Sequence, residues 1–243
     1  MPYTPDENLR FIERVSSEDL KPLVEIIAGK SDNRRWNEFL SVSDEYKMHG
    51  EDYAKYWQRI LQEFQEYGGN SILNIFRDSG ASYTKILHGV CKKMKVTCGI
   101  NAGIVDREMA LLTKILEKSL EKMTDEEKRK LCDELKIKTA NPTGPVIMSA
   151  IQVAINAGGF MSYQIAVIVA NAVLKTVIGR GLTFAANAAL TRTIGIFAGP
   201  IGWAVSGIWL IFDLASPAYR VTIPGCVYIA YLRQKYSNTV PCA

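Results

Sequence analysis

An uncharged stretch of 36 residues constrains the fold of this chain more than any other feature of its sequence. Residues 139–174 contain no Asp, Glu, Lys or Arg, and residues 193–212 form a second uncharged run of 20 residues. Gly, Ala, Ile and Val dominate both runs. Because exposing so much apolar surface to water is unfavourable, these segments must be covered by the chain's own helices, by a partner or by a lipid bilayer.

The charged residues are divided unevenly between the two halves of the chain. Residues 1–138 contain 23 Lys and Arg against 24 Asp and Glu, whereas residues 139–243 contain 6 Lys and Arg against one acid, Asp213. The net charge of +4 therefore comes from missing acids rather than from a basic patch. Nucleic-acid-binding proteins usually cluster their Lys and Arg, so we expect no nucleic-acid partner. The acid-poor second half is compatible with an anionic membrane surface.

Helical periodicity runs through the first half. Apolar side chains recur at helical spacing and predict helices over residues 51–67, 83–94 and 106–123. Thr124 and Glu127 have the spacing of a capping box, which predicts a helix from there to about Ile137. Since no segment before residue 138 alternates as a strand does, this half is predicted to be all-α.

Caps, glycines and prolines predict where helices begin and end. Thr4 and Glu7 have capping-box spacing and predict the start of the first helix. Gly68–Gly69 predicts a left-handed end to the helix over residues 51–67, with a new short helix from Ser71. Pro224 predicts the start of the last helix, because proline fits the first helical turn.

A cluster of two prolines and a glycine at residues 141–145 is the clearest boundary signal in the chain. It divides the chain into an amphipathic helical region at residues 1–138, a Pro/Gly linker or corner at 139–145, and an apolar Gly/Ala-rich helical region at 146–243. Within the last region, we expect a small, Ala-rich helix over residues 182–192 and a helix that starts at Pro200.

Two adjacent glycines, Gly158 and Gly159, interrupt the first uncharged run. The simplest interpretation is the turn of an αα-hairpin, whose arms of about 13 to 16 residues span roughly 20–24 Å, less than the ~30 Å hydrocarbon core of a bilayer. A helix that continued through the glycines would cross a membrane once, so both alternatives stay open. We therefore predict an all-α fold, in which a charged amphipathic N-terminal half packs with an apolar Gly/Ala-rich C-terminal half that contains an αα-hairpin.

Small residues in the second uncharged run recur four apart, which lets helix backbones approach closely. Trp203 and Trp209 are either interfacial anchors or plain core residues. The candidate contacts with a membrane or an apolar protein partner are Gly158, Gly159, Gly195, Gly199, Gly202, Trp203, Ser206 and Trp209.

The sequence contains no motif of catalysis, cofactor binding or metal binding. His49 and His88, the only histidines, have no cysteine or carboxylate at ligand spacing, and we expect His88 to be a core or boundary residue. The five cysteines include no CxxC pair and are expected to be reduced thiols of a cytosolic protein. The chain starts with a polar, acidic segment, so no secretory signal is predicted.

Two stretches of the sequence carry a family resemblance. One runs from Tyr67-Gly68-Gly69-Asn70-Ser71-Ile72 to Ile86-Leu87, and the other includes Gly199-Pro200-Ile201-Gly202 and Ala218-Tyr219-Arg220-Val221-Thr222-Ile223-Pro224. Over most of its length the chain resembles the YaaW-like bacterial protein family, whose members are labelled as related to ubiquinol–cytochrome c chaperones. The motif residues are Gly68, Gly69, Ser71, Tyr219, Arg220 and Pro224. The resemblance implies no catalytic residue.

These patterns favour a non-enzymatic helical protein of the cytoplasm, at most peripheral to the inner membrane. Its apolar second half would be buried in the chain itself and would contact a membrane surface or an apolar protein partner under some conditions. One alternative is an assembly chaperone for a respiratory-chain cytochrome complex, and another is a pore-forming-like membrane-active protein. Self-association into a homo-oligomer stays open, and no cofactor is expected.

Overall fold

The structure is a computed structural model of the whole chain, and it describes residues 3, 5–28, 40, 42–71, 81–99, 101–158, 160–182 and 218–238. Every regular element in these ranges is a helix, so the predicted all-α fold class is confirmed. The elements are η1 (Glu7–Arg14), α1 (Ser17–Ala28), α3 (Asp44–His49), η2 (Tyr53–Tyr56), α4 (Trp57–Ser71), α5 (Tyr83–Lys93), α6 (Ile104–Leu120), α7 (Asp125–Glu134), α8 (Gly144–Asn156), α9 (Met161–Ile178) and α11 (Tyr219–Asn238).

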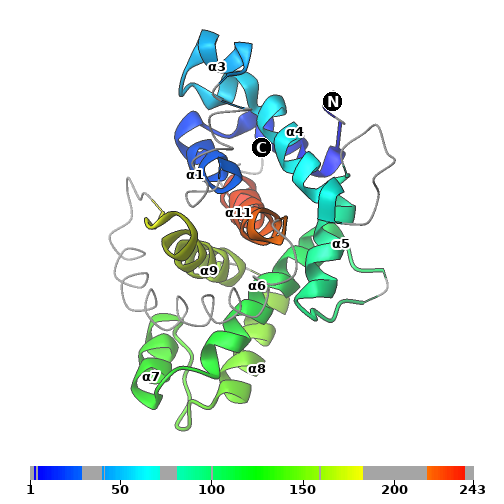
Figure 1. Cartoon of the computed structure of the whole chain (residues 1–243). Coiled ribbons are helices and arrows are strands. Elements are labelled where there is room, and N and C mark those ends of the chain that lie inside the picture. Colours follow the sequence, from blue (N-terminus) through cyan, green and yellow to red (C-terminus); the bar gives the residue numbers. More distant parts are fainter. Residues whose placement is uncertain are drawn as a thin grey trace.

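Helix α11 lies at the centre of the fold (Figure 1). It contacts η1, α1, α4, α5, α6 and α9, which come from both halves of the sequence. All its side chains from Val221 to Leu232 are buried, and none of them is charged. A helix without a polar stripe belongs in a protein interior, so α11 is the element on which the other helices pack.

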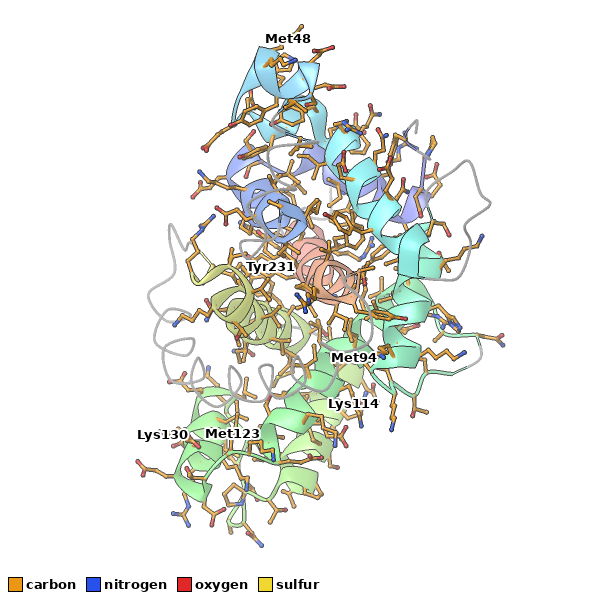
Figure 2. The ribbon with its side chains drawn as sticks, in the orientation of Figure 1. Met48, Met94, Lys114, Met123, Lys130 and Tyr231 are labelled. Carbon is orange, nitrogen blue, oxygen red and sulfur yellow. The ribbon has the colours of Figure 1, made fainter. Side chains whose placement is uncertain are left out.

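Helix α9 is the second buried helix and packs along α11. Its side chains from Ile165 to Leu174 are all buried. Tyr163 of α9 stacks on Tyr231 of α11 with ring centroids 6.4 Å apart, and Tyr231 lies in the interior between the two helices (Figure 2). Among the described residues, α9 is the one helix long and apolar enough to span a membrane, and 61% of it is buried inside the protein. The chain's own helices therefore cover most of this part of the uncharged run.

A turn at Gly158 separates α8 from α9, at a position that the sequence predicted. Gly158 has a φ of +79°, a left-handed conformation that favours glycine. The two helices have different surroundings, because α9 lies in the interior whereas α8 runs towards the periphery beside α6 (Figure 1).

Helix α4 does not end at Gly68–Gly69 as predicted, but continues to Ser71. The prediction that a new helix starts at Ser71 is therefore wrong, because Ser71 is the last residue of α4. A Cβ atom at position 68 would overlap the side chain of Ile86 on α5. The glycine thus serves the close packing of α4 on α5, which offsets the cost of about 1 kcal/mol for glycine inside a helix.

The predicted start of the last helix at Pro224 is also wrong, because α11 begins at Tyr219. A proline after the first turn removes one backbone hydrogen bond, and burial of the apolar side chains of α11 outweighs that loss. The neighbouring Gly225 has no room for a side chain, since a Cβ atom there would overlap the ring of Phe64 on α4.

The helix caps agree with the sequence in one case and differ in another. Thr124 and Glu127 form the predicted capping box, with a Thr124 N–H to Glu127 Oε2 distance of 2.8 Å. The first element is instead capped by Asp6, whose Oδ1 accepts the N–H of Asn8 at 2.9 Å. The predicted cap at Thr4 was wrong, because the first element is a 3-10 helix that starts at Glu7.

Several predictions fall outside the described residues. They are the helix over residues 182–192 and the helix that starts at Pro200. The division of the chain at residues 139–145 stays a prediction.

Candidate functional site

Of the predicted contact residues for a membrane or a partner, Gly158 is the one that lies within the described ranges, and it is exposed. The others are Gly159, Gly195, Gly199, Gly202, Trp203, Ser206 and Trp209. All of these lie outside the described residues, so their role stays a prediction.

Helix α8 and the turn after it expose apolar side chains. Val146, Val153 and Phe160 are 41%, 67% and 53% exposed, and we name these three residues the α8 surface. Only Ile147 and Ile151 of α8 are buried, and the helix contains no charged residue. An amphipathic surface helix would turn polar side chains outward. Exposed apolar surface of this kind is typical of contact sites for other macromolecules.

The described parts of the two stretches that carry the family resemblance meet where α4, α5 and α11 pack together. Gly68 of α4 packs against α5, and Lys93 near the end of α5 places its Nζ 5.4 Å from the ring centroid of Tyr219 on α11. Pro224 lies in the buried part of α11, whereas Arg220 is exposed. Gly68, Tyr219 and Pro224 thus belong to a packing junction between three helices, and Arg220 lies at its exposed edge.

A buried ion pair that the sequence analysis missed joins α6 to α11. Arg233 donates from Nε to Glu108 Oε2 at 2.7 Å and from Nη2 to Glu108 Oε1 at 3.1 Å. The two side chains are 14% and 3% exposed. Tyr83 of α5 donates its hydroxyl to Glu108 Oε1 at 2.7 Å, and the Arg233 Nη2 also donates to the carbonyl of Asn8 in η1 at 2.7 Å. These bonds fasten four elements to one another.

The charges of this ion pair stabilise each other. Burial alone would lower the pKa of Arg233, but the hydrogen bond and the charge of Glu108 outweigh it and raise that pKa. Burial and the Glu108 charge also raise the pKa of Tyr83 well above its ordinary value, which keeps the phenol protonated as a donor. The sequence contained a signal for this site, because Glu108 shares the apolar face of its helix with Leu112 and Ile115, where a charge needs a partner.

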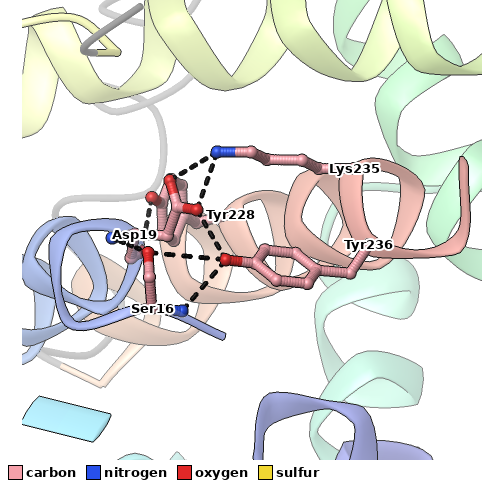
Figure 3. Close-up of polar contacts among 5 residues, drawn as sticks. All are labelled: Ser16, Asp19, Tyr228, Lys235 and Tyr236. Atoms are coloured by element: carbon pink, nitrogen blue, oxygen red, sulfur yellow. Dashed lines mark hydrogen bonds and ion pairs between the residues drawn. The ribbon is translucent and has the colours of Figure 1, made fainter. Parts of the chain in front are cut away.

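A second polar cluster fastens α1 to α11 (Figure 3). The carboxylate of Asp19 accepts from Lys235 Nζ at 2.7 Å on both oxygens and from the Tyr236 hydroxyl at 2.7 Å. The Tyr236 oxygen in turn accepts the backbone N–H of Ser16 at 2.9 Å, and the Tyr228 hydroxyl donates to the Asp19 carbonyl at 2.8 Å. These groups are engaged with one another, so the cluster acts as a structural clamp.

A pocket of about 480 Å³ lies between the loop after α5, helix α6 and the last turns of α8. Its lining includes Cys98, and several of its polar groups are already paired. Lys114 donates to Glu117 at 2.7 Å, and Gln152 donates to Asn156 at 2.9 Å. The pocket therefore offers few unengaged polar groups for recognising a small ligand.

The histidines lie apart from these clusters. His88 is exposed on α5, so the expectation of a core or boundary residue was wrong; the helix turns this side away from the apolar face. His49 is exposed and stacks on Tyr56, with centroids 6.4 Å apart. Within the described ranges, no group of three or more His, Cys, Asp or Glu side chains is placed to hold a metal ion.

Comparisons with known proteins give the family of the chain. The profile of the family described as ubiquinol-cytochrome C chaperone matches residues 52–228. A UPF0174 protein from Helicobacter pylori strain J99 is 48% identical over 237 residues, which cover 97% of this chain and 94% of that protein. A UPF0174 protein from H. pylori strain 26695 is 43% identical and covers 82% of this chain and 98% of its own length. The UPF0174 protein YaaW of Escherichia coli K12 is 28% identical, and the match covers 98% of each chain.

No solved structure matches the chain significantly. The matched profile spans α4, α5, α6 and the first part of α11, so it includes Glu108 and the packing junction but not Arg233. The resemblance to YaaW-like proteins that the sequence motifs indicated is confirmed. The chain belongs to the UPF0174 family, and residues 52–228 belong to the ubiquinol-cytochrome C chaperone family.

Proposed function

We propose that this protein is a non-enzymatic assembly chaperone, which binds an apolar segment of a partner polypeptide on the α8 surface. The family description names a chaperone of ubiquinol–cytochrome c, so the proposed partner is a subunit of that respiratory complex. The observation that carries the proposal is the exposure of Val153 and Phe160 beside the buried helix α9. Subunits that await assembly expose apolar surface, which such a site would cover.

The described polar groups support a binding role over a catalytic one. The carboxylate of Glu108 accepts hydrogen bonds from Arg233 and Tyr83. The carboxylate of Asp19 accepts hydrogen bonds from Lys235 and Tyr236. A general acid or base needs a proton-transfer path to a substrate, and these side chains use their lone pairs internally. The apolar α8 surface, by contrast, has its side chains available for contact.

The test is a deletion of the gene in the bacterium that encodes the protein, followed by complementation. We expect the deletion to lower the membrane content of b- and c-type haem, measured by reduced-minus-oxidised difference spectra. The wild-type gene should restore both signals, whereas the Val153→Glu/Phe160→Glu variant should not, because two charges would have to be desolvated on binding.

Met48→Glu is the matched control. Met48 is 75% exposed on α3, at the end of the molecule opposite α8 (Figure 2). This variant places a single carboxylate on an exposed apolar residue and should complement fully. Unchanged membrane cytochromes in the deletion strain would refute the proposal.

A membrane surface is the competing partner for the same residues, and a pore-forming activity would require insertion of the apolar helices. We place the chaperone in the cytoplasm, peripheral to the inner membrane, where unassembled subunits are accessible. Co-sedimentation with vesicles of phosphatidylethanolamine and phosphatidylglycerol distinguishes a lipid partner from a protein partner. If wild-type protein binds these vesicles and Val153→Glu/Phe160→Glu does not, the partner is lipid. Light scattering of the protein alone would show whether it forms a homo-oligomer.

A further inference from the structure

We propose that Cys91 and Cys98 are a redox-active pair that forms a reversible intramolecular disulfide when a small-molecule disulfide oxidises the protein. This site does not depend on the chaperone function. It rests on the way in which the chain reverses direction after α5 and brings two free thiols together.

The reversal begins at the end of α5. Lys95 has a φ of +53°, a left-handed conformation, and the N–H of Val96 donates to the carbonyl of Cys91 at 2.8 Å. The hydrogen bond from residue 96 to residue 91 closes a helix-terminating turn, which folds the following residues back over the last turn of α5. As a result, Cys98 is folded back towards Cys91, and both cysteines lie against the same turn of α6. Cys98 lines a pocket together with Asp106 and Ala110, and the Sγ of Cys91 contacts the carbonyl of Arg107. Both cysteines are free.

The two thiols have different access to solvent. Cys98 is partly exposed and lines the pocket of about 480 Å³ between the loop, α6 and α8. Cys91 is 4% exposed, and its Sγ donates to the carbonyl of Arg107 on α6 at 3.9 Å. Burial, together with the neighbouring Cys98, raises the pKa of Cys91 to about 12. A reagent in solution therefore meets Cys98 first, and Cys91 is the resolving thiol.

The exchange proceeds in two balanced steps. The thiolate of Cys98 attacks one sulfur of glutathione disulfide, whose S–S bond breaks, and one glutathione leaves as its thiolate. Cys91 then gives its proton to that released thiolate and attacks the Sγ of Cys98, so the second glutathione leaves. The two cysteines lose two electrons in total, which glutathione disulfide gains. The pocket beside Cys98 supplies room for the transient mixed disulfide.

Tryptic digestion distinguishes this disulfide from every other pairing. Trypsin cuts after Lys92, Lys93 and Lys95, so Cys91 and Cys98 fall in separate peptides, 86–92 and 96–107. Native full-length protein is treated with glutathione disulfide, its remaining thiols are blocked with N-ethylmaleimide, and the digest is analysed by mass spectrometry without reduction. We expect a species of the two peptides joined by one disulfide, which disappears when dithiothreitol is added.

Two variants complete the test. Cys98→Ser should abolish the linked species and leave Cys91 unmodified, whereas the control Cys132→Ser, at a buried thiol on α7, should leave the linked species at its wild-type yield. Circular dichroism of each variant verifies folding. A stable glutathione adduct on Cys98 without the linked species, a bond between Cys91 and Cys226, or protein without any oxidation would each overturn the proposal.

Discussion

Arg233 lies 125 residues beyond Glu108 in the sequence, yet its guanidinium holds the Glu108 carboxylate through hydrogen bonds of 2.7 and 3.1 Å. The ion pair is largely buried, with side chains 14% and 3% exposed. Replacing Arg233 alone would leave the charge of Glu108 without a partner in the interior. We expect Arg233→Ala to lower the free energy of unfolding by about 3–5 kcal/mol, measured by urea denaturation.

The exposed pair of Arg10 and Glu7 is the control for this prediction. These side chains are 74% and 89% exposed at an N–O distance of 3.9 Å. Arg10→Ala should change the free energy of unfolding by less than about 1 kcal/mol, because solvent screens the pair. A similar loss in both variants would contradict the interpretation of Glu108 and Arg233 as a stabilising buried ion pair.

The contact between Gly225 and Phe64 gives a test of the packing between α11 and α4. A Cβ atom at Gly225 would overlap the Phe64 ring, so Gly225→Ala should destabilise the protein by about 1–3 kcal/mol. The same substitution should cost less in a Phe64→Leu background, since the two sites are coupled. Gly99→Ala is the control, because a Cβ atom there meets nothing within 4 Å.

Asp19 should contribute measurably to stability through its bonds to α11. We expect Asp19→Ala to lower the free energy of unfolding by about 1–3 kcal/mol, since Lys235 and Tyr236 lose a shared acceptor. Glu13→Ala, which truncates an exposed acid of η1, should have little effect in the same urea titration. Equal effects of the two substitutions would show that the cluster in Figure 3 does not stabilise the fold.

The burial of the Glu63 carboxylate predicts that the stability of the fold depends on pH. The Oε1 of Glu63 is buried without a hydrogen bond, although the Nη2 of Arg59 lies 2.5 Å from it. Burial raises the pKa of Glu63, and this effect outweighs the positive charge of Arg59, which lowers it. The folded state therefore binds the proton more tightly than the unfolded state, and stability from this group is lost as the pH rises from about 4.5 through the folded pKa.

Glu63→Gln should remove this loss. At pH 7 the variant should be more stable than wild type by on the order of 1 kcal/mol, and the difference should vanish near pH 4. Urea titrations at both pH values measure it. Glu13→Gln, at an exposed position in η1, should leave the pH dependence as in wild type. A destabilised Glu63→Gln protein at pH 7 would mean that the Arg59 contact dominates.

Local signals in the sequence predicted the elements that depend on neighbours along the chain. The capping box at Thr124 and the turn at Gly158 lie where they were expected, because a cap or a left-handed turn involves only nearby backbone groups. Apolar spacing likewise located α5 and α6 to within a few residues. These features were sufficient for the all-α class.

The predictions that failed concern residues whose environment comes from distant segments. Gly68 looked like a helix end, but it accommodates Ile86 of α5, and Pro224 looked like a helix start, but the packing of α11 extends the helix before it. The Glu108 partner lies in another helix, which no pattern of spacing within α6 identifies.

The sequence alone thus determined the helical class, several helix limits and the uncharged run that needs cover, since these follow from short-range spacing and composition. The tertiary structure decided how that run is used: α9 is buried against α11, whereas α8 exposes Val153 and Phe160. The reason is that α8 has no charged residue and α9 has one, Lys175, so neither helix carries a charged face that would fix its orientation. The burial of each helix depends on which distant helices reach it, and only the folded arrangement specifies them.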